Sequence, residues 1–408
     1  MPAKPHIAIV TNSTWTVYNF CLHFIKRFRL AGYRVTVIAP VDEYIQYLHN
    51  SYFVKHIPLR YLKHHGTNPL MDVLLVRELF GIYRREKPDL ILHFGIKPNI
   101  YGSLAARFGR IPAISTVMGL GYTFLHPRFF KHIVWPLYRL AFRQNKAVVF
   151  LNKADRKLFV SQRLLGKEQA VLIRGTGVNT NYFRPLSRPS VDRFVFVYIG
   201  RLLYDKGIAE YVQAARKLRA LSPRIECWIV GDFSYANQAA VSREELLEWV
   251  AEKSVRYFGS ARDVRPYLKR ADALVLPSYR EGLSRVITEA MSMEKPVVTT
   301  QVPGCVDAIE DGVNGFLAKA RDVESLAEAM YRMYLLSEEE RRAMGLRNRK
   351  KVLQLFDEKI IFEKYLELVR HSGCLPKAVD AVNSSKTKPH AKISARLDLC
   401  DLPNDTET

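Results

Sequence analysis

The sequence has few cysteines and no long uncharged hydrophobic run. Its five cysteines are scattered among 408 residues without a C-x-x-C pair, which argues against a disulfide framework and a zinc site. Polar residues interrupt every apolar stretch before the roughly 20 residues of a membrane span. The N-terminus has one Lys before a four-residue apolar run, too short for a signal peptide. We therefore expect a cytoplasmic chain whose contact with a membrane is peripheral.

Acidic residues are scarce in the first half of the chain. Residues 1–185 hold 27 Lys and Arg against 8 Asp and Glu, whereas the rest of the chain holds 35 against 32. This one-sided excess predicts a partner with a negative surface, which means nucleic acid, anionic lipid headgroups or a phosphorylated substrate. Because 48% of the residues are hydrophobic, intrinsic disorder of the whole chain is excluded.

Short apolar runs alternate with segments of helical periodicity in both halves of the chain. Strand patterns occur at 6–10, 88–94 and 111–117, and again at 194–200, 225–231, 272–278 and 295–300. Continuous apolar character is typical of parallel strands that are covered on both faces. The pattern therefore predicts an α/β protein with two doubly wound domains.

A polar, Pro-containing break at 184–193 separates these domains. We expect one domain at 1–185, a second at 186–355, and a C-terminal helix at 356–372 that returns towards the first domain. Residues 373–408 lose periodicity and gain Ser, Lys, Pro and Asp, which predicts a disordered tail.

Two glutamates eight positions apart mark a candidate ligand site. Glu281 precedes a helix predicted to begin near Ser284, and Glu289 lies about five residues into it, roughly 7 Å along the axis. A helix N-terminus offers unpaired N–H groups and a positive dipole end to a diphosphate. The two carboxylates would then accept hydroxyls of a sugar on one side and of a ribose on the other. An isolated pair at this spacing is more often a solvated helix face.

Two cations in the same domain favour a ligand site over a solvated helix face. Arg201 and Lys206 lie in the segment GRLLYDKG, at a strand end of the kind where open α/β sheets bind ligands. An Arg presents a planar fork and a Lys a point charge, and both suit phosphate oxygens. Together with the two glutamates they predict a nucleotide-sugar site.

These segments resemble the retaining glycosyltransferases of family 4, which have the GT-B fold of two Rossmann-like domains facing across a cleft. The similarity is carried by GRLLYDKG, IVGD, FGSARDVRPYL and the segment at 278–317. In the first domain, residues 15–40, 93–124 and 174–183 are similar to the branch that builds capsule, O-antigen and lipid-linked oligosaccharides. The resemblance covers roughly residues 6 to 370.

The resemblance implies a role for each candidate residue. Arg201 and Lys206 would bind the donor diphosphate and Glu281 the transferred sugar, which makes these three the catalytic set. Glu289 would hold the ribose. The remaining donor-binding residues come from two loops that would face each other across the cleft, and they are Gly282, Leu283 and Ser284 on one side and Gly119, Leu120 and Gly121 on the other.

Two histidine observations bear on the mechanism. Many family members carry a His after the strand at 111–117, whereas this sequence has Val117, Met118 and Gly119, so no histidine catalyst is assigned. His93 is expected at another strand end, facing the cleft, where it is either an acceptor ligand or a core histidine. The family mechanism passes the acceptor's proton to a diphosphate oxygen and needs no separate base. Because the sequence has no D-x-D and two cations serve the diphosphate, we expect no metal cofactor.

The basic first half bears on the acceptor. Residues 101–150 contain seven Lys or Arg and no acid, interleaved with aromatics, which suits docking on an anionic membrane surface. No nucleic-acid motif is present. We therefore expect a transferase that moves a hexose or N-acetylhexosamine from a UDP-sugar to a polyprenyl-diphosphate sugar or a lipopolysaccharide or capsule precursor. GDP-mannose is an alternative donor. A nucleotide-sugar epimerase or phosphorylase and a non-catalytic scaffold are the alternative functions.

Overall fold

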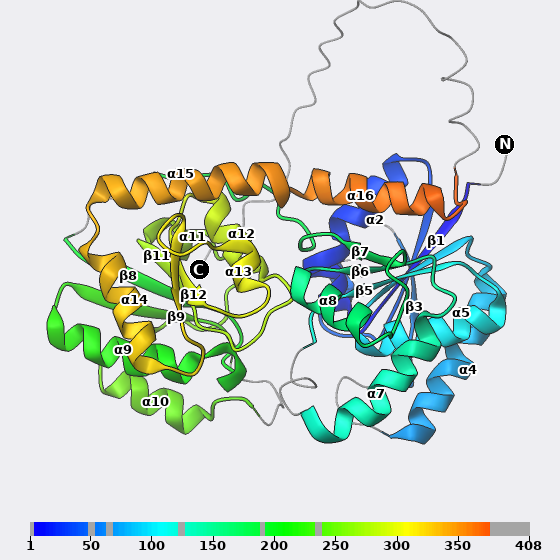
Figure 1. Ribbon diagram of the computed structural model, residues 1–408, viewed down its shortest axis with the longest axis horizontal. Helices are drawn as coiled ribbons and strands as arrows, with labels where there is room; N and C mark the ends of the chain where they lie inside the picture. Colours follow the sequence, from blue (N-terminus) through cyan, green and yellow to red (C-terminus); the bar gives the residue numbers. More distant parts are fainter. Residues whose placement is uncertain are drawn as a thin grey trace, which may run out of the picture.

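The computed structural model describes residues 4–47, 54–62, 68–120, 127–187, 192–232 and 239–375. It contains two separate β-sheets with helices packed around each, side by side along the long axis (Figure 1). The strand order is β3-β2-β1-β4-β5-β6-β7 in the first sheet and β10-β9-β8-β11-β12-β13 in the second. Every pairing between the named strands of these sheets is parallel, which confirms the prediction of two doubly wound domains.

The first sheet is built from seven short strands whose central members are fully buried, as their continuous apolar character requires. Its strands are β1 (His6–Thr11), β2 (Arg34–Ala39), β3 (Lys55–Pro58), β4 (Leu90–Phe94), β5 (Ala113–Val117), β6 (Ala147–Phe150) and β7 (Ala170–Leu172). The helical segments around it are α1 (Thr14–Thr16), η1 (Val17–Cys21), α2 (Leu22–Leu30), α4 (Pro69–Glu86), η2 (Pro98–Gly102), α5 (Ser103–Gly109), α7 (Pro127–Phe142) and α8 (Lys153–Ser161).

The second sheet has the same layered construction around one hydrophobic core. Its strands are β8 (Phe194–Ile199), β9 (Ile225–Val230), β10 (Arg256–Tyr257), β11 (Ala273–Leu276), β12 (Val297–Thr300) and β13 (Gly315–Ala318). Its helices are η3 (Tyr204–Lys206), α9 (Ile208–Leu221), α10 (Arg243–Ala251), α11 (Arg265–Arg270), α12 (Arg285–Ser292), α13 (Cys305–Ala308), α14 (Val323–Leu335) and α15 (Glu338–Leu355).

The C-terminal helix α16 (Glu358–His371) packs on the first domain, whereas α15 lies along the second (Figure 1). The ring of Tyr365 lies 4.6 Å from that of Phe24, and its hydroxyl shares a hydrogen bond of 2.8 Å with the Thr116 hydroxyl. The chain passes from one domain to the other twice, near Val178 and near Phe356. These two segments are hydrogen-bonded to each other, since Val178 N donates to Phe356 O over 2.9 Å. α16 therefore contributes apolar side chains to a core cluster of the first domain. Most of the predicted tail, from residue 376, lies outside the described residues.

Candidate active site

A cavity of about 500 Å³ lies between the two domains. Its walls come from the segments that follow β1, β4, β5 and β6 in the first domain, and from those that follow β8 and β11 in the second. These are the carboxyl ends of parallel strands, where open α/β sheets bind ligands. The two domains therefore present their ligand-binding edges to one shared cavity.

The predicted cations and Glu281 meet on the second-domain wall of this cavity. Lys206 Nζ lies 2.5 Å from Glu281 Oε1, and the Ser278 hydroxyl donates to the same oxygen over 2.7 Å. Both side chains of the ion pair are largely buried. Arg201 also lines the cavity, and it has no ion pair within the described part of the chain. This wall therefore offers an unpaired guanidinium and a pre-positioned Lys–Glu pair to a ligand.

Glu289 lies one turn inside α12, where the prediction placed it. Arg285, the first residue of that helix, holds the carboxylate with Nε 2.7 Å from Glu289 Oε1. Burial raises the pKa of the Glu289 carboxyl, and the Arg285 guanidinium opposes that shift. Ser284 occupies the N-cap position without a side-chain capping bond, so the first N–H groups of α12 stay available at the cavity.

The two glycine loops touch each other across the cavity. A Cβ on Gly282 would stand 1.9 Å from the carbonyl oxygen of Met118, and one on Gly119 would stand 3.0 Å from Gly282 N. Gly119 also has a φ of +133°, a conformation that only glycine adopts without strain. Close approach at Gly282 therefore brings the two domains together.

Leu283 and Ser284 also line the cavity, as predicted. Leu283 packs against the hydrophobic cores of both domains. A Cβ on Gly175, which has a φ of +77°, would stand 2.6 Å from Leu283 Cδ2. Leu283 therefore joins the two domains through its side chain, in addition to any backbone contact that it makes with a ligand.

Of the predicted residues that the structure describes, Leu120 and His93 do not line the cavity. Leu120 is completely buried in the first domain's core, so its predicted donor contact is wrong for the side chain. Gly121 lies outside the described residues. The prediction that His93 faces the cleft is wrong, because its side chain is fully buried on β4. Its Nε2 hydrogen-bonds the Tyr83 hydroxyl over 3.1 Å, and burial lowers its pKa to about 3. His93 is a core histidine.

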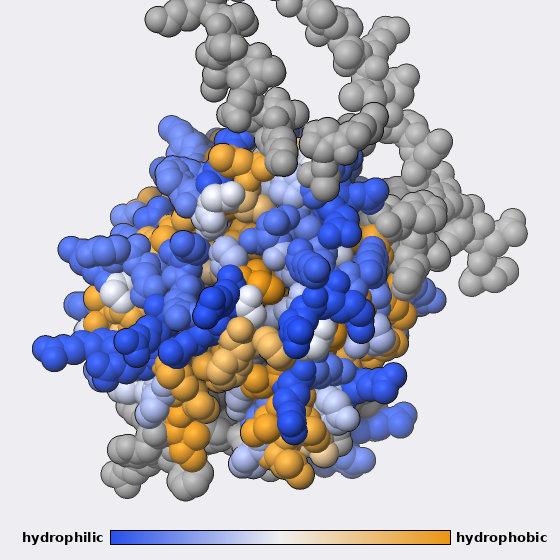
Figure 2. All heavy atoms as spheres, turned by 90° about the vertical axis from the view of Figure 1, so that its right-hand side faces the viewer, coloured by the Kyte–Doolittle hydropathy of each residue, from blue (hydrophilic) through white to orange (hydrophobic). Residues whose placement is uncertain are grey.

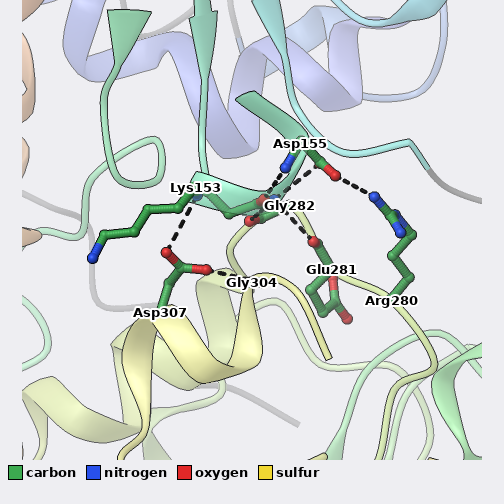
Figure 3. Close-up of polar contacts among 8 residues, drawn as sticks. Lys153, Asp155, Arg280, Glu281, Gly282, Gly304 and Asp307 are labelled. Atoms are coloured by element: carbon green, nitrogen blue, oxygen red, sulfur yellow. Dashed lines mark hydrogen bonds and ion pairs between the residues drawn. The ribbon is translucent and has the colours of Figure 1, made fainter. Parts of the chain in front are cut away.

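The loop that carries Glu281 and Gly282 is fastened to the first domain (Figure 3). Asn152 Nδ2 donates to Gly282 O over 2.8 Å and to Glu281 O over 3.3 Å. Arg280, next in the loop, forms an ion pair with Asp155. Burial raises the pKa of Asp155, and the Arg280 guanidinium opposes that shift. These contacts set the position of the candidate donor loop relative to the first domain.

A second set of contacts, around the start of α13, supports the same loop. Lys153 N donates to Asp307 Oδ1 over 3.3 Å, and Gly304 N donates to the other oxygen of that carboxylate over 3.3 Å (Figure 3). Gly304 has a φ of +83°, and a Cβ there would stand 2.6 Å from Glu281 O. The loop therefore rests on backbone that only glycine allows so close.

Sequence reasoning missed several residues of the site. Arg285 could have been found from the sequence, because it lies four positions before Glu289 on a predicted helix and side chains at that spacing contact each other. Asn152 could not have been found in this way, because its role depends on the packing of one domain on the other. Two aromatics on the first-domain wall, Trp15 and Phe20, were also missed. Within the described residues, no group of three or more His, Cys, Asp or Glu side chains has the arrangement of a metal site.

Family models match both domains. Residues 6–152 match a model described as glycosyl transferase 4-like, and residues 193–335 match one described as glycosyl transferases group 1. The chain is 27% identical over 384 residues to a Campylobacter jejuni N,N'-diacetylbacillosaminyl-diphospho-undecaprenol alpha-1,3-N-acetylgalactosaminyltransferase, covering 89% of this chain and 97% of that protein. It is 25% identical over 280 residues to an Escherichia coli UDP-Gal:alpha-D-GlcNAc-diphosphoundecaprenol alpha-1,3-galactosyltransferase, covering 65% and 71%.

Solved structures share the fold at low sequence identity. Anabaena HepE, in complex with UDP and glucose, superposes with a TM-score of 0.73 at 19% identity, covering 89% of this chain and 99% of that one. Sucrose-phosphate synthase from Thermosynechococcus elongatus gives a TM-score of 0.75 at 18% identity, covering 90% and 99%. The chain has the GT-B fold, and it belongs to the glycosyltransferases built from a glycosyl transferase 4-like domain followed by a group 1 domain.

Proposed function

We propose that the protein transfers a hexose or N-acetylhexosamine from a UDP-sugar to a lipid-linked glycan, with retention of the anomeric configuration. The observation that carries the donor half of this proposal is the convergence of Arg201, Lys206, Glu281 and Glu289 on one interdomain cavity. Its volume of about 500 Å³ is within the usual range for small-molecule sites. The arrangement suits a ligand with a diphosphate between two hydroxyl-bearing rings.

The proposed chemistry divides between the cations and the glutamates. Arg201 and Lys206 stabilise the diphosphate as it leaves, Glu281 accepts hydroxyls of the transferred sugar, and Glu289 accepts those of the ribose. The acceptor oxygen forms its bond to the anomeric carbon as the bond from that carbon to the diphosphate oxygen breaks. The acceptor's proton passes to a diphosphate oxygen on the same face.

The absence of a dedicated base in this proposal agrees with the pairing of the two acids. Glu281 and Glu289 are the carboxylates on the described lining of the cavity, and each already neutralises a cation, Lys206 or Arg285. We further propose that no metal is required, because Arg201, Lys206 and the uncapped start of α12 supply the positive charge that a leaving diphosphate needs.

The acceptor class rests on the relatives. The Campylobacter jejuni and Escherichia coli enzymes are named for acceptors in which a sugar is joined to undecaprenol through a diphosphate. Such an acceptor lies in a membrane, so the proposal places this protein peripherally on the inner face of the cell membrane, in polysaccharide, O-antigen, capsule or lipopolysaccharide synthesis. No helix of the described chain is both long and apolar enough to cross a bilayer.

The surface of the first domain supports peripheral docking. Figure 2 looks onto the end of the molecule formed by that domain, where hydrophobic groups lie among hydrophilic ones. Exposed apolar residues in this domain include Leu70 and Val73 on α4 and Phe108 on α5. Charged surface with embedded apolar side chains is what an interfacial site between water and lipid requires.

A shallow groove beside α7 supports the same proposal. It is lined by the cations Arg139, Arg143 and Arg163 together with apolar residues that include Leu140 and Leu165. Guanidinium groups bind phosphate oxygens through parallel N–H bonds. The groove is therefore the place where we expect an anionic lipid headgroup to bind.

The donor half is tested by calorimetric titration of UDP, with GDP as the competing nucleotide and EDTA present throughout. Wild type is compared with Glu289→Ala and with a control, Glu248→Ala, at an exposed position on α10. We expect saturable UDP binding that is weakened at position 289 and unchanged at position 248. Preference for GDP would overturn the UDP assignment, and binding that EDTA abolishes would overturn metal independence.

The acceptor half is tested by following UDP release and product formation with UDP-hexoses and UDP-N-acetylhexosamines against short-chain polyprenyl-diphosphate monosaccharides. We expect turnover that needs the acceptor and gives a product with the donor's anomeric configuration. Epimerised donor without acceptor would favour the epimerase, and nucleotide binding without turnover would favour a scaffold.

A further inference from the structure

Two asparagines on the first-domain wall of the cavity have amide oxygens that are left unused. Asn12 follows β1, and Asn99 lies in η2, and both line the cavity. The Oδ1 atom of each is buried and has no hydrogen-bond partner within the described part of the chain. Buried polar atoms are satisfied in the great majority of cases, so two such oxygens in one cavity call for an explanation.

The orientation of Asn99 is fixed by its other contacts. The residue is only 1% exposed, its Nδ2 donates to Thr116 O over 2.8 Å, and its backbone N donates to Gly95 O over 2.9 Å. The amide nitrogen is therefore occupied, and the oxygen is the atom that stays without a partner.

Asn12 packs against Gly95, the residue whose carbonyl accepts the backbone hydrogen bond of Asn99. This glycine has a φ of +103°, and a Cβ there would stand 2.3 Å from Asn12 Nδ2 and 2.9 Å from its Oδ1. Any other residue at position 95 would displace the Asn12 side chain. The backbone of Gly95 therefore links the two asparagines, through packing on one side and a hydrogen bond on the other.

The chemistry of this wall differs from that of the wall opposite. Arg201, Lys206 and Arg285 bring charged N–H donors to the second-domain wall, which suits a diphosphate. An amide oxygen is a hydrogen-bond acceptor, so it repels phosphate oxygens and binds hydroxyl or amide N–H groups. Trp15 and Phe20 also line the cavity from the first domain, with ring centroids 5.5 Å apart, and offer an apolar face to a sugar ring.

We infer that Asn12 and Asn99 form the subsite for the acceptor sugar and that their Oδ1 atoms accept hydrogen bonds from its hydroxyl or N-acetyl N–H groups. The inference rests on the proposed function, and it names the part of this cavity that receives the second substrate. A neutral amide does not remove the proton of the attacking hydroxyl. Asn12 and Asn99 therefore orient the acceptor, and the proton still passes to the diphosphate.

The test compares Asn12→Ala and Asn99→Ala with Asn181→Ala, a control at an exposed asparagine that does not line the cavity. UDP affinity is measured by calorimetry, and steady-state transfer gives the donor KM and the KM for a polyprenyl-diphosphate N-acetylhexosamine. We expect each site variant to raise the acceptor KM at least about tenfold, the worth of one buried hydrogen bond, with UDP affinity and donor KM unchanged. Unchanged acceptor KM in both variants, or a raised donor KM instead, would overturn the inference.

A second readout separates this inference from the lipid-linked acceptor of the proposed function. Saturation-transfer NMR follows binding of methyl glycosides of common hexoses and N-acetylhexosamines to UDP-saturated protein. Binding that weakens in both asparagine variants but not in Asn181→Ala supports the subsite even if no lipid-linked sugar is a substrate. If UDP binds and no glycoside does, the subsite assignment is wrong whatever the donor half shows.

Asn99→Ala also removes the hydrogen bond to Thr116 O, so its effect combines two losses. The more specific variant is therefore made at Asn12, where Asn12→Asp keeps an acceptor oxygen. We expect it to retain more acceptor affinity than Asn12→Ala. An equal loss in both Asn12 variants would contradict a role for Oδ1 as the accepting atom.

Discussion

Lys206 Nζ and Glu281 Oε1 lie 2.5 Å apart on the wall of the interdomain cavity. They come from different loops, one after β8 and the other after β11, so the second sheet aligns them before any ligand binds. The Ser278 hydroxyl holds the same carboxylate oxygen. An incoming diphosphate therefore meets a lysine whose position is already set, and this lowers the cost of ordering it on binding.

Replacing Lys206 with Ala should weaken donor binding without unfolding the protein. A charge-assisted hydrogen bond contributes about 1.5–3 kcal/mol, so we expect UDP affinity to fall roughly 10- to 100-fold. Glu281 keeps its bond from Ser278, which limits the structural damage. Calorimetry measures the affinity and circular dichroism the fold. Unchanged UDP affinity would remove Lys206 from the donor site.

Replacing Gly282 with Ala should separate the two domains locally. The new Cβ would stand 1.9 Å from Met118 O, and because that neighbour is backbone, one loop must move. A misplacement of about 1 Å costs on the order of 100-fold in turnover, which is the loss in kcat that we expect. Gly81→Ala is the matched control, since nothing lies within 4 Å of a Cβ there. Full activity in Gly282→Ala would contradict a close domain contact in the working enzyme.

Much of the fold could be predicted, because buried parallel strands appear in a sequence as short continuous apolar runs. The patterns at 6–10, 111–117 and 225–231 became β1, β5 and β9 with boundaries within a few residues. β7 and β10 were not predicted, because strands of three and two residues give no periodicity to detect. Hydrogen bonding to a neighbouring strand makes these segments part of the sheets, and that neighbour is distant in sequence.

The candidate site was readable only where its residues lie in one motif. Glu281 and Glu289 were found from their spacing about a helix start, which the structure places at Arg285. The end of β4 does lead into the cavity wall, but His93 lies on the covered face of that strand, where its ring hydrogen-bonds the buried Tyr83 hydroxyl. The sequence could not tell on which side of the strand this side chain lies, so it left a core histidine and an acceptor ligand both open. Asn12 and Asn99 were invisible, since their unpartnered oxygens follow from packing around Gly95.

Shortening Asn152 should loosen the donor loop while preserving the helix that Asn152 caps. Asn152→Ser keeps a capping oxygen for the start of α8 but is too short to reach Glu281 O and Gly282 O. Loss of two hydrogen bonds of about 1 kcal/mol each predicts a roughly tenfold or greater fall in kcat/KM for the donor. The same loss should lower the melting temperature by only about 4–8 °C in a protein of this size. A large drop in melting temperature with normal kcat/KM would assign Asn152 a purely structural role.

Donor affinity should fall in mild acid because of Glu289. Burial raises the pKa of this carboxyl above its ordinary 4.5, so in the free protein it takes up a proton at a higher pH than usual. A protonated carboxyl accepts ribose hydroxyls less well, so UDP binding should release that proton. Affinity is therefore full above the raised pKa and declines as the pH falls through it. Titrations in two buffers of different ionisation enthalpy count the released protons.

The matched variant for this pH effect is Glu289→Gln, which keeps the shape of the side chain and removes its titration. We expect weaker UDP binding and no proton release linked to this position. The same proton release in Glu289→Gln would show that another group titrates.

Membrane binding should depend on the groove beside α7. Arg139, Arg143 and Arg163 line it, and each cation near an anionic surface contributes about 1 kcal/mol, so Arg139→Glu with Arg143→Glu should weaken binding at least about 30-fold. Cosedimentation with phosphatidylglycerol vesicles at low and high salt measures this, and added salt should release the wild type.

The apolar part of the contact is tested at Leu140, which is 45% exposed on α7. Leu140→Glu adds a charge next to the groove, whereas Leu221→Glu makes the same change at an exposed position on α9 of the second domain. Because only the first domain carries the basic excess, the α7 variant should lose vesicle binding and the α9 variant should keep it. Equal loss in both variants would mean that the interaction follows overall charge and that the groove is not the docking site.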